Sequence, residues 1–206
     1  MSGSLQVLGD VSRETSERLS AYAALLRKWN PAINLVARST LDDLETRHFK
    51  DSAQLFGLCP TDARHLVDLG SGGGFPGLVI AILARELAPD LHVTLIESDQ
   101  RKAAFLRTVC RDLGLAATNV IDSRIESAKP QGADVLSARA LAPLPRLLDY
   151  ADRHLAPGGV ALFPKGARFA EELDAALASW RFDVQNHPSK TDPQAVVLKL
   201  GGIARV

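Results

Sequence analysis

From about residue 65 onward, short apolar runs alternate with longer segments whose apolar residues recur at helical spacing. The apolar runs predict strands at about 65–69, 93–96, 120–121, 133–136 and 160–163. The intervening segments predict helices at about 76–88, 99–113, 144–155 and 169–180. Two further runs, 182–184 and 195–200, predict a terminal antiparallel hairpin. This alternation predicts an α/β fold with a mostly parallel, doubly wound sheet and helices on both faces.

The first sixty residues show helical periodicity without strand patterns. One apolar face, with Asp10 as a candidate N-cap, comprises Val11, Leu19, Tyr22, Leu26 and Trp29. Asn30-Pro31 is expected to end that helix. A second helix, capped by Ser39 or Thr40, has an apolar face made of Leu41, Leu44, His48 and Leu55. This extension is either a lid over the sheet edge or a structural cap, and its periodicity fits both.

Length and composition indicate one ordinary globular domain. A chain of 206 residues suits a single α/β domain, divided here into a helical extension (1–60) and a core (61–206). Lys plus Arg and Asp plus Glu balance at 24 each, so any nucleic-acid contact must come from a local patch. The two cysteines, Cys59 and Cys110, make no disulfide framework, which fits a reducing cytosol. With no secretory signal and no apolar run near the ~18 residues of a membrane span, we expect a cytoplasmic protein.

The segment from Asp68 to Gly77, DLGSGGGFPG, is the strongest local signal. It follows the predicted strand 65–69 and leads into the predicted helix at Pro76. Glycines allow positive φ and let a ligand approach the backbone, and proline suits the first turn of a helix. Strand, glycine turn and helix start together predict a nucleotide-type binding corner at the carboxyl edge of a parallel sheet. The alternative is a flexible glycine linker, which would not be framed so closely by a strand and a helix.

The type of ligand is indicated by the acid at the end of the strand. The dinucleotide pattern Gly72-x-Gly74-x-x-Gly77 is present, with Glu97 twenty residues further on, but this pattern alone is weak. Asp68 would repel a pyrophosphate and suits the ammonium of an amino-acid moiety. S-adenosylmethionine carries such a group and no phosphate. The acidic strand end therefore favours a methyl donor over NAD.

Further candidates follow the next two strands. Glu97 ends the second strand, where a carboxylate can reach ribose hydroxyls, and its alternative role is a solvated helix cap. Asp122 to Glu126 follow the third strand, where the adenine of the ligand is expected to lie. Backbone N–H groups there and the side chain of Ile125 could hold the base, although the segment could equally be an ordinary polar loop.

Two cations follow the fourth and fifth strands. Arg139 lies where a transferred methyl group would sit and could hold a phosphate or orient the donor carboxylate. Its alternative role is a structural salt bridge with an acid such as Asp68. Lys165 reaches the same edge of the sheet, where it is either a phosphate contact or an ordinary surface lysine.

The segment Arg47-His48-x-x-Asp51-Ser52 places His48 and Asp51 on one helical face. Without further context, His48 is best interpreted as a core histidine. No Ser/His/Asp triad and no metal-ligand spacing is recognisable, and neither Tyr22 nor Tyr150 has a lysine four residues later. We therefore predict no metal site, and the missing Tyr-x-x-x-Lys pair removes one common route to NAD-dependent hydride transfer.

Several motifs, in order, resemble one family. They are Lys28-Trp29-Asn30, Asn34-Leu35, Arg47-His48-x-x-Asp51-Ser52, the Gly-Phe-Pro-Gly ending at Gly77, Glu97-Ser98, Lys102, Phe105-Leu106, Arg124-x-Glu126, Ser137 to Ala140 and Lys165-Gly166. The chain resembles the bacterial small-subunit ribosomal RNA guanine-N7 methyltransferases, also called the glucose-inhibited division protein B family. The match runs from about Lys28 to Gly166.

The resemblance implies a class I (Rossmann-like) methyltransferase that uses S-adenosyl-L-methionine to methylate N7 of a guanine in 16S ribosomal RNA. It carries donor contacts onto Gly70, Phe75, Ile125, Glu126 and Arg139, with Glu97 at the ribose. The glycine turn itself adds Asp68, Gly72 and Gly74 to the predicted donor site. Its substrate-binding residues would be Arg47, His48, Asp51, Ser52 and Lys165. The expected partner is ribosomal RNA or the small ribosomal subunit, and we expect a monomer.

Two alternatives remain: a methyltransferase acting on a small molecule, and a non-enzymatic nucleotide-binding module. The glycine turn with Asp68 and Glu97 argues against the second. An RNA substrate predicts that the cations Arg38, Arg47, Lys50, Arg139, Lys165 and Arg168 share the face of the pocket.

Overall fold

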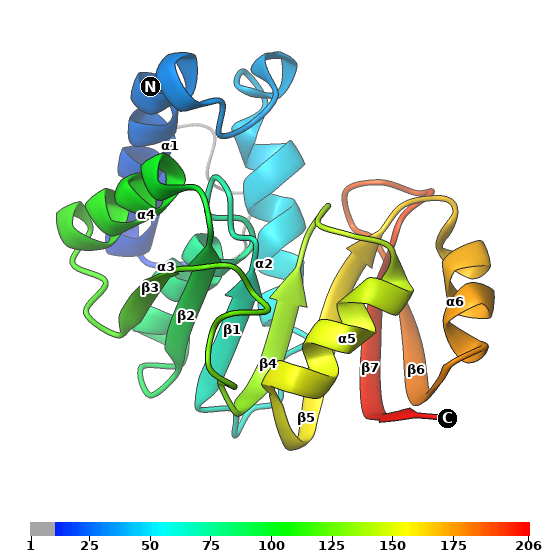
Figure 1. Ribbon diagram of the computed structural model, residues 1–206. Helices are drawn as coiled ribbons and strands as arrows, with labels where there is room; N and C mark the ends of the chain where they lie inside the picture. The colour runs from blue at the N-terminus through cyan, green and yellow to red at the C-terminus, as the bar shows by residue number, and fades with distance from the viewer. Residues whose placement is uncertain (1–10) are drawn as a thin grey trace.

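A computed structural model describes residues 11–206 and contains one seven-stranded sheet with the order β3-β2-β1-β4-β5-β7-β6 (Figure 1). The strands are β1 (His65–Leu69), β2 (His92–Glu97), β3 (Thr118–Asp122), β4 (Ala133–Ala138), β5 (Leu155–Lys165), β6 (Trp180–Pro188) and β7 (Val196–Arg205). The first five strands pair in parallel, and β7 pairs antiparallel with both β5 and β6. The predicted doubly wound sheet and terminal hairpin are both confirmed.

Helices cover both faces of the sheet. They are α1 (Arg13–Ile33), α2 (Asp51–Phe56), α3 (Gly77–Leu87), α4 (Gln100–Asp112), α5 (Leu144–His154) and α6 (Phe169–Leu177). Helices α1 to α4 share one apolar cluster with one face of the sheet, and α5 and α6 share a second cluster with the other face. In Figure 1, α5 accordingly lies in front of the sheet and α3 behind it.

Strand β1 shows how the sequence builds these two clusters. Its residues Leu66 to Leu69 are all buried, and Leu66 packs into the first cluster while Val67 and Leu69 pack into the second. Successive side chains of a strand point to opposite faces, so a strand covered on both sides reads as a continuous apolar run. The one charged residue in this buried run is Asp68, which marks the site described below.

Helix α1 differs from its prediction at both ends. Its N-cap is Ser12, whose hydroxyl accepts from the N–H of Thr15, and the predicted cap, Asp10, lies outside the described residues. The prediction that Asn30-Pro31 ends the helix is wrong, because α1 continues to Ile33. The buried Asn30 side chain accepts from the N–H groups of Leu35 and Val36, which follow the C-cap Asn34, and so turns the chain just beyond the helix.

The predicted second helix begins later than expected and is not α-helical throughout. Its predicted caps, Ser39 and Thr40, lie in a 3₁₀ turn, η2 (Arg38–Thr40), and the helix itself consists of a π-helical segment, η3 (Glu45–Lys50), that runs directly into α2. Such widened helical turns are frequently found at functional sites. Here η3 carries Arg47 and His48, two of the residues that the sequence singles out.

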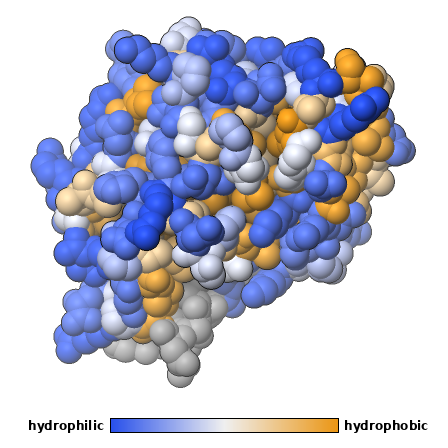
Figure 2. Space-filling model, turned by 90° about the horizontal axis from the view of Figure 1, so that it is seen from below, coloured by the Kyte–Doolittle hydropathy of each residue, from blue (hydrophilic) through white to orange (hydrophobic). Residues whose placement is uncertain are grey.

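Few large apolar side chains are exposed in the described part of the chain. Among residues 11–206, the large apolar side chains that are exposed are Leu87, Leu177, Val184 and Val206. They belong to different elements, and the face seen in Figure 2 shows apolar residues interspersed with hydrophilic ones. Within the described part of the chain, no helix combines the length and apolarity needed to cross a bilayer.

Candidate active site

The glycine-rich turn between β1 and α3, residues Gly70 to Gly77, forms a tight corner at the carboxyl edge of the sheet. Gly70, Gly72 and Gly74 have φ values of +61°, +55° and +97°, which favour glycine. The N–H of Gly77, the first residue of α3, donates to Asp68 Oδ2 at 3.2 Å. Because a carboxylate already occupies this helix terminus, the corner suits a ligand without a pyrophosphate.

Asp68 lies beneath the corner and is fully buried. Its other oxygen, Oδ1, accepts from the Ser137 hydroxyl at 2.7 Å, so this carboxylate links β1, β4 and the start of α3. Burial raises the pKa of Asp68 to about 6, and the bonds from Ser137 and Gly77 and the charge of Arg139 act in the opposite direction. Because this pKa lies close to neutral pH, a cation bound nearby would change the protonation of Asp68 in that range.

The glycines of the corner serve different purposes. A Cβ at Gly70 would come within 2.6 Å of the Leu141 side chain, and one at Gly74 would lie 2.6 Å from the Tyr22 hydroxyl. At Gly72 the nearest neighbour of a Cβ is the Gly70 carbonyl oxygen at 3.7 Å. Packing of the protein therefore requires Gly70 and Gly74, whereas the space in front of Gly72 is open to a ligand.

Glu97 is the last residue of β2 and joins the corner to the next loop. Its Oε2 accepts from the N–H of Gly72 and its Oε1 from the N–H of Asp99, both at 2.8 Å. The alternative of a solvated helix cap does not describe this residue, because Glu97 is buried and Asp99 caps α4 instead. The carboxylate is held at the rim of the corner, within reach of a ligand bound to Gly72.

The loop after β3 continues the same edge of the sheet. The N–H of Ser123 donates to the Glu97 carbonyl at 3.2 Å, which ties the start of this loop to the end of β2. Ile125 is buried in the second apolar cluster. Glu126 bonds to Arg146 and Tyr150 of α5 at 2.7 and 2.8 Å. The segment is thus a fixed part of the sheet edge and not a free polar loop.

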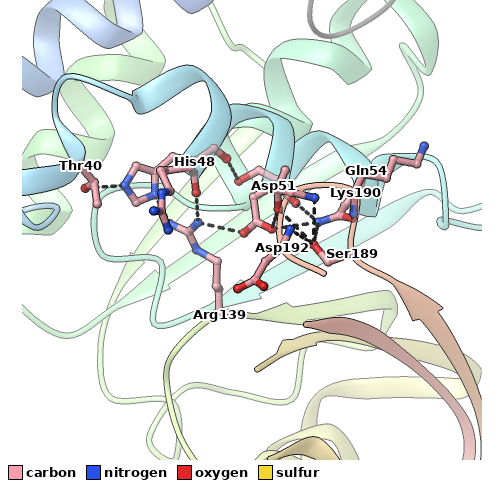
Figure 3. Close-up of polar contacts among 11 residues, drawn as sticks. Thr40, His48, Asp51, Gln54, Arg139, Ser189, Lys190 and Asp192 are labelled. Carbon is pink, nitrogen blue, oxygen red and sulfur yellow. Dashed lines mark hydrogen bonds and ion pairs between the residues drawn. The ribbon is translucent and has the colours of Figure 1, made fainter. Parts of the chain in front are cut away.

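Arg139, directly after β4, is the most connected side chain of the site (Figure 3). Its Nη1 pairs with Asp51 Oδ2 at 3.2 Å, and its Nη2 donates to His48 Nδ1 at 2.9 Å. The guanidinium also lies 4.9 Å from the centre of the Phe75 ring. Arg139 thus forms the structural salt bridge considered above as its alternative role, but it does so with Asp51 and not with Asp68. Residues 47–51 are thereby joined to the glycine corner.

These contacts determine the state of His48. Arginine only donates, so Nδ1 of His48 is unprotonated and the proton lies on Nε2, which donates to the Thr40 hydroxyl at 2.9 Å. Burial and the charge of Arg139 lower the pKa of His48 to about 4. The ring stacks on Phe75 with 4.8 Å between ring centres. His48 is therefore a neutral group that holds Arg139 and Phe75 in place.

Ser52 does not lie at the surface of the site. It is fully buried, and its hydroxyl donates to the His48 carbonyl at 2.6 Å. Asp51, in contrast, accepts from Gln54 and from the Thr191 hydroxyl, both at 2.9 Å, on the side away from Arg139. Figure 3 shows the loop around Ser189 and Lys190 reaching this carboxylate.

A cleft of about 840 Å³ opens beside Arg139. Its wall includes Arg47, Arg139, Lys165 and Arg168, so four of the six cations predicted to share the pocket face do so. Arg38 and Lys50 do not line it.

Lys165, at the end of β5, is not an ordinary surface lysine, because only 8% of its side chain is exposed. Its Nζ donates to Glu172 at 2.7 Å and to the Ala142 carbonyl at 2.9 Å. The same Glu172 oxygen accepts from the N–H of Leu144 at 2.7 Å. Lys165 therefore fixes the segment 142–144 that follows Arg139, and its charge is already neutralised.

Comparison with known proteins identifies the family. The family profile described as GidB, rRNA small subunit methyltransferase G, matches residues 15–196. The chain belongs to this family. It is 61% identical to the ribosomal RNA small subunit methyltransferase G of Rhodospirillum centenum, over 94% of this chain and 87% of that protein. The protein of the same name from Cereibacter sphaeroides is 55% identical over 96% and 95%.

Solved structures of methyltransferases share the fold of this family member at low sequence identity. A methyltransferase from Geobacter sulfurreducens superposes with a TM-score of 0.59 at 17% identity, covering 90% of this chain and 88% of that one. An O-methyltransferase from Bacillus cereus in complex with S-adenosylhomocysteine gives 0.57 at 16% identity, with coverages of 95% and 94%. The predicted class I methyltransferase fold is confirmed.

Several residues that support the site were not predicted from the sequence, and four of them contact the residues described above directly. They are Tyr22, whose hydroxyl donates to the Gly73 carbonyl, Leu141, which packs over Gly70, Thr191, which bonds Asp51, and His154, which bonds Ile125. Tyr22 was visible only as an apolar position of a helix. The other three lie far along the chain from their partners, and no local motif marks them.

Proposed function

We propose that this protein transfers a methyl group from S-adenosyl-L-methionine to N7 of a guanine in the 16S RNA of the small ribosomal subunit. One observation carries the proposal: Arg139 touches Phe75 of the glycine corner and also lines the cleft. A donor in the corner and a base in the cleft would meet at this side chain. The small-molecule alternative is not favoured, because relatives at 51–61% identity are named for ribosomal RNA.

The residues of the corner fit the donor. The open backbone at Gly72 would lie along its methionine part, and the Glu97 carboxylate would accept from the ribose hydroxyls. Ile125 and Glu126 would border the adenine, and Arg139 would orient the carboxylate of the amino-acid part. When bound, the donor supplies an electrophilic methyl group on a sulfonium.

The charges around the cleft suit a product that gains a positive charge. Guanine N7 carries a lone pair and no proton, so the reaction needs alignment and no general base. Methylation makes the base cationic, and unpaired cations beside it would oppose the reaction. Arg139 is paired with Asp51 and Lys165 with Glu172, so both cations nearest the junction are neutralised. Arg47 and Arg168 are exposed at the wall of the cleft and are suited to RNA phosphates.

We further propose that residues 1–206 act as one methyltransferase domain and that the enzyme works as a cytoplasmic monomer. Residues of α1 such as Leu19 and Tyr22 belong to the same apolar cluster as Leu66 and Leu95 of the sheet, which supports one domain. Light scattering coupled to size exclusion would test the monomer directly.

Transfer of labelled methyl groups tests the function. Small subunits and naked 16S RNA from cells lacking the modification would be incubated with the protein and labelled donor, and the modified base mapped by its sensitivity to borohydride and aniline. We expect label in one N7-methylguanine. Label at another atom, or none in either substrate, would contradict the proposal. A matched Glu97→Gln variant should weaken donor binding at least tenfold and leave RNA affinity unchanged, because the carboxylate faces the donor corner.

A further inference from the structure

Helix α5 directs polar side chains onto the loop that follows β3. Arg146, Tyr150, Arg153 and His154 all bond to residues 125–128 of this loop. Positions three, four, seven and eight apart lie on one face of a helix, so these four side chains form a single surface. We refer to them as the α5 clamp.

The contacts of the clamp reach both side chain and backbone of the loop. Arg146 and Tyr150 bond the Glu126 carboxylate at 2.7 and 2.8 Å. Arg153 donates to the Ala128 carbonyl at 2.8 Å. His154 Nε2 lies 3.0 Å from the Ile125 carbonyl oxygen. Each residue that borders the expected adenine is therefore held from α5.

His154 is the least expected member of the clamp. It is fully buried, and since a carbonyl only accepts, its proton lies on Nε2 and Nδ1 is left as an acceptor. Within the described chain, Nδ1 has no hydrogen-bond partner. Burial also lowers the pKa of His154, so the ring is neutral. A buried unpaired acceptor costs free energy that an apolar side chain would avoid, and the one bond that this ring gains fixes Ile125.

We propose that His154 is a positioning residue for donor recognition, which sets the Ile125 backbone against the adenine. Arg146 and Tyr150 do the same for Glu126. The inference rests on the proposed function, because it requires the donor adenine to lie at Ile125 and Glu126. His154 itself would not touch the donor, because it acts from α5 through its hydrogen bond to the loop.

Two ligands that differ by the adenine test this proposal. S-adenosylhomocysteine contains the base, and S-ribosylhomocysteine lacks it. Calorimetry, with competition for the weaker ligand, would give both affinities for the parent and for His154→Leu. We expect His154→Leu to weaken S-adenosylhomocysteine at least tenfold and to leave S-ribosylhomocysteine unchanged. His154→Gln retains an N–H near the position of Nε2 and should restore most of the affinity.

The matched control is His65→Leu. His65 bonds the Thr94 hydroxyl at 2.9 Å at the amino end of β1, on the far edge of the sheet from the donor corner. This variant also removes a histidine hydrogen bond between elements, and it should bind both ligands like the parent.

The outcomes distinguish the role of His154 from the placement of the adenine in the proposed function. An equal loss for both ligands, or no loss for either, would overturn the role of His154. A parent protein that binds both ligands equally would instead refute the placement of adenine in the proposed function. If His154→Leu does not fold, Tyr150→Phe provides the second test, with an expected two- to fivefold loss confined to S-adenosylhomocysteine. A Tyr150→Phe protein with parental affinities would overturn the clamp.

Discussion

Asp68 is an ionisable group in the interior of the molecule, directly beneath the donor corner. With a pKa raised to about 6, it holds a proton in the folded, ligand-free protein at mildly acidic pH. A bound ammonium favours the carboxylate, so donor binding below pH 6 must release this proton. The charge of Arg139 lowers the pKa of Asp68, and burial raises the pKa of the neighbouring Tyr22 well above its usual value, so Tyr22 stays neutral in this range.

We therefore predict that the affinity for S-adenosylhomocysteine falls as the pH is lowered from 7 to 5. The loss should approach tenfold per unit well below pH 6, and Asp68→Asn should remove the dependence. The pKa of His48, about 4, lies below this window. Calorimetry at several pH values measures the effect. A flat profile for the parent would restrict Asp68 to holding Gly77 and Ser137 in place.

The glycines predict opposite outcomes for two similar substitutions. A side chain at Gly74 would press against Tyr22 and Leu78 within the protein, so Gly74→Ala should lower stability by about 1–3 kcal/mol. Gly72→Ala meets open space, and although its positive φ adds strain, it should chiefly weaken donor binding. Thermal melts paired with calorimetry distinguish them. A Gly72→Ala protein with parental donor affinity would show that no ligand approaches this backbone.

At the scale of elements, α1 reaches the donor corner through Tyr22. This buried side chain donates to the Gly73 carbonyl, and its ring centre lies 5.5 and 5.4 Å from those of Phe49 and Phe75. The helix is therefore a structural cap whose packing extends to the corner. Its periodicity could not show this, because an amphipathic helix has the same pattern whether it packs firmly or closes as a lid.

Tyr22→Phe tests this link while conserving the ring. Removing the hydroxyl leaves the Gly73 carbonyl without this donor, so we expect a loss of stability of about 1–2 kcal/mol. We also expect a severalfold weaker affinity for S-adenosylhomocysteine. Denaturant melts and calorimetry measure both quantities. If stability falls and donor affinity does not, α1 supports the core without shaping the site.

The β6–β7 loop reaches the site from the other end of the chain. Thr191 bonds one oxygen of Asp51, and Arg139 pairs with the other. Thr191→Val keeps the shape and removes the bond, so Asp51 should hold Arg139 less firmly and donor affinity should fall two- to tenfold. Thr191→Ser should restore it. The control is Thr108→Val, because the Thr108 hydroxyl bonds within its own helix, to Ala104. Equal affinities for the two valine variants would contradict this role.

The sequence predicted elements better than it predicted side-chain partners. Strand β1 and its glycine turn were found because a buried parallel strand and a positive-φ turn each restrict composition locally. The 3₁₀ turn η2 and the π-helical start of the second helix were missed, since a π-helical segment of 6 residues is too short to set an apolar period of its own. The partners of Arg139 and Lys165 were missed because they depend on the distance between residues far apart in the chain. Asp51 and Glu172 became visible as partners only in the folded protein.

At the scale of the whole molecule, a chain with no net charge must bind RNA through the local arrangement of its cations. The cleft shows such an arrangement in two classes. Arg139 and Lys165 are paired with acids in its interior. Arg47 and Arg168 are exposed at its wall, and the one ion pair that they make within the described chain, Arg47 with Asp43 at 3.9 Å, is open to solvent. A protein cation displaces the counterions condensed on RNA only when it is exposed and can contact a phosphate. The salt dependence of RNA binding should therefore follow the second class.

Arg168→Ala and Lys165→Ala separate these classes. Arg168 lines the cleft at the start of α6, and within residues 11–206 it makes no ion pair, so its loss should weaken RNA binding and reduce the slope of log affinity against log salt by about 1. Lys165→Ala should keep the parental slope, because its charge is neutralised by Glu172, and should lower stability by about 2 kcal/mol by leaving that carboxylate without its partner. RNA binding across a salt series, beside thermal melts, measures both. If Lys165→Ala flattens the slope and Arg168→Ala does not, the RNA backbone lies deeper in the cleft, and the Lys165–Glu172 pair must open to receive it.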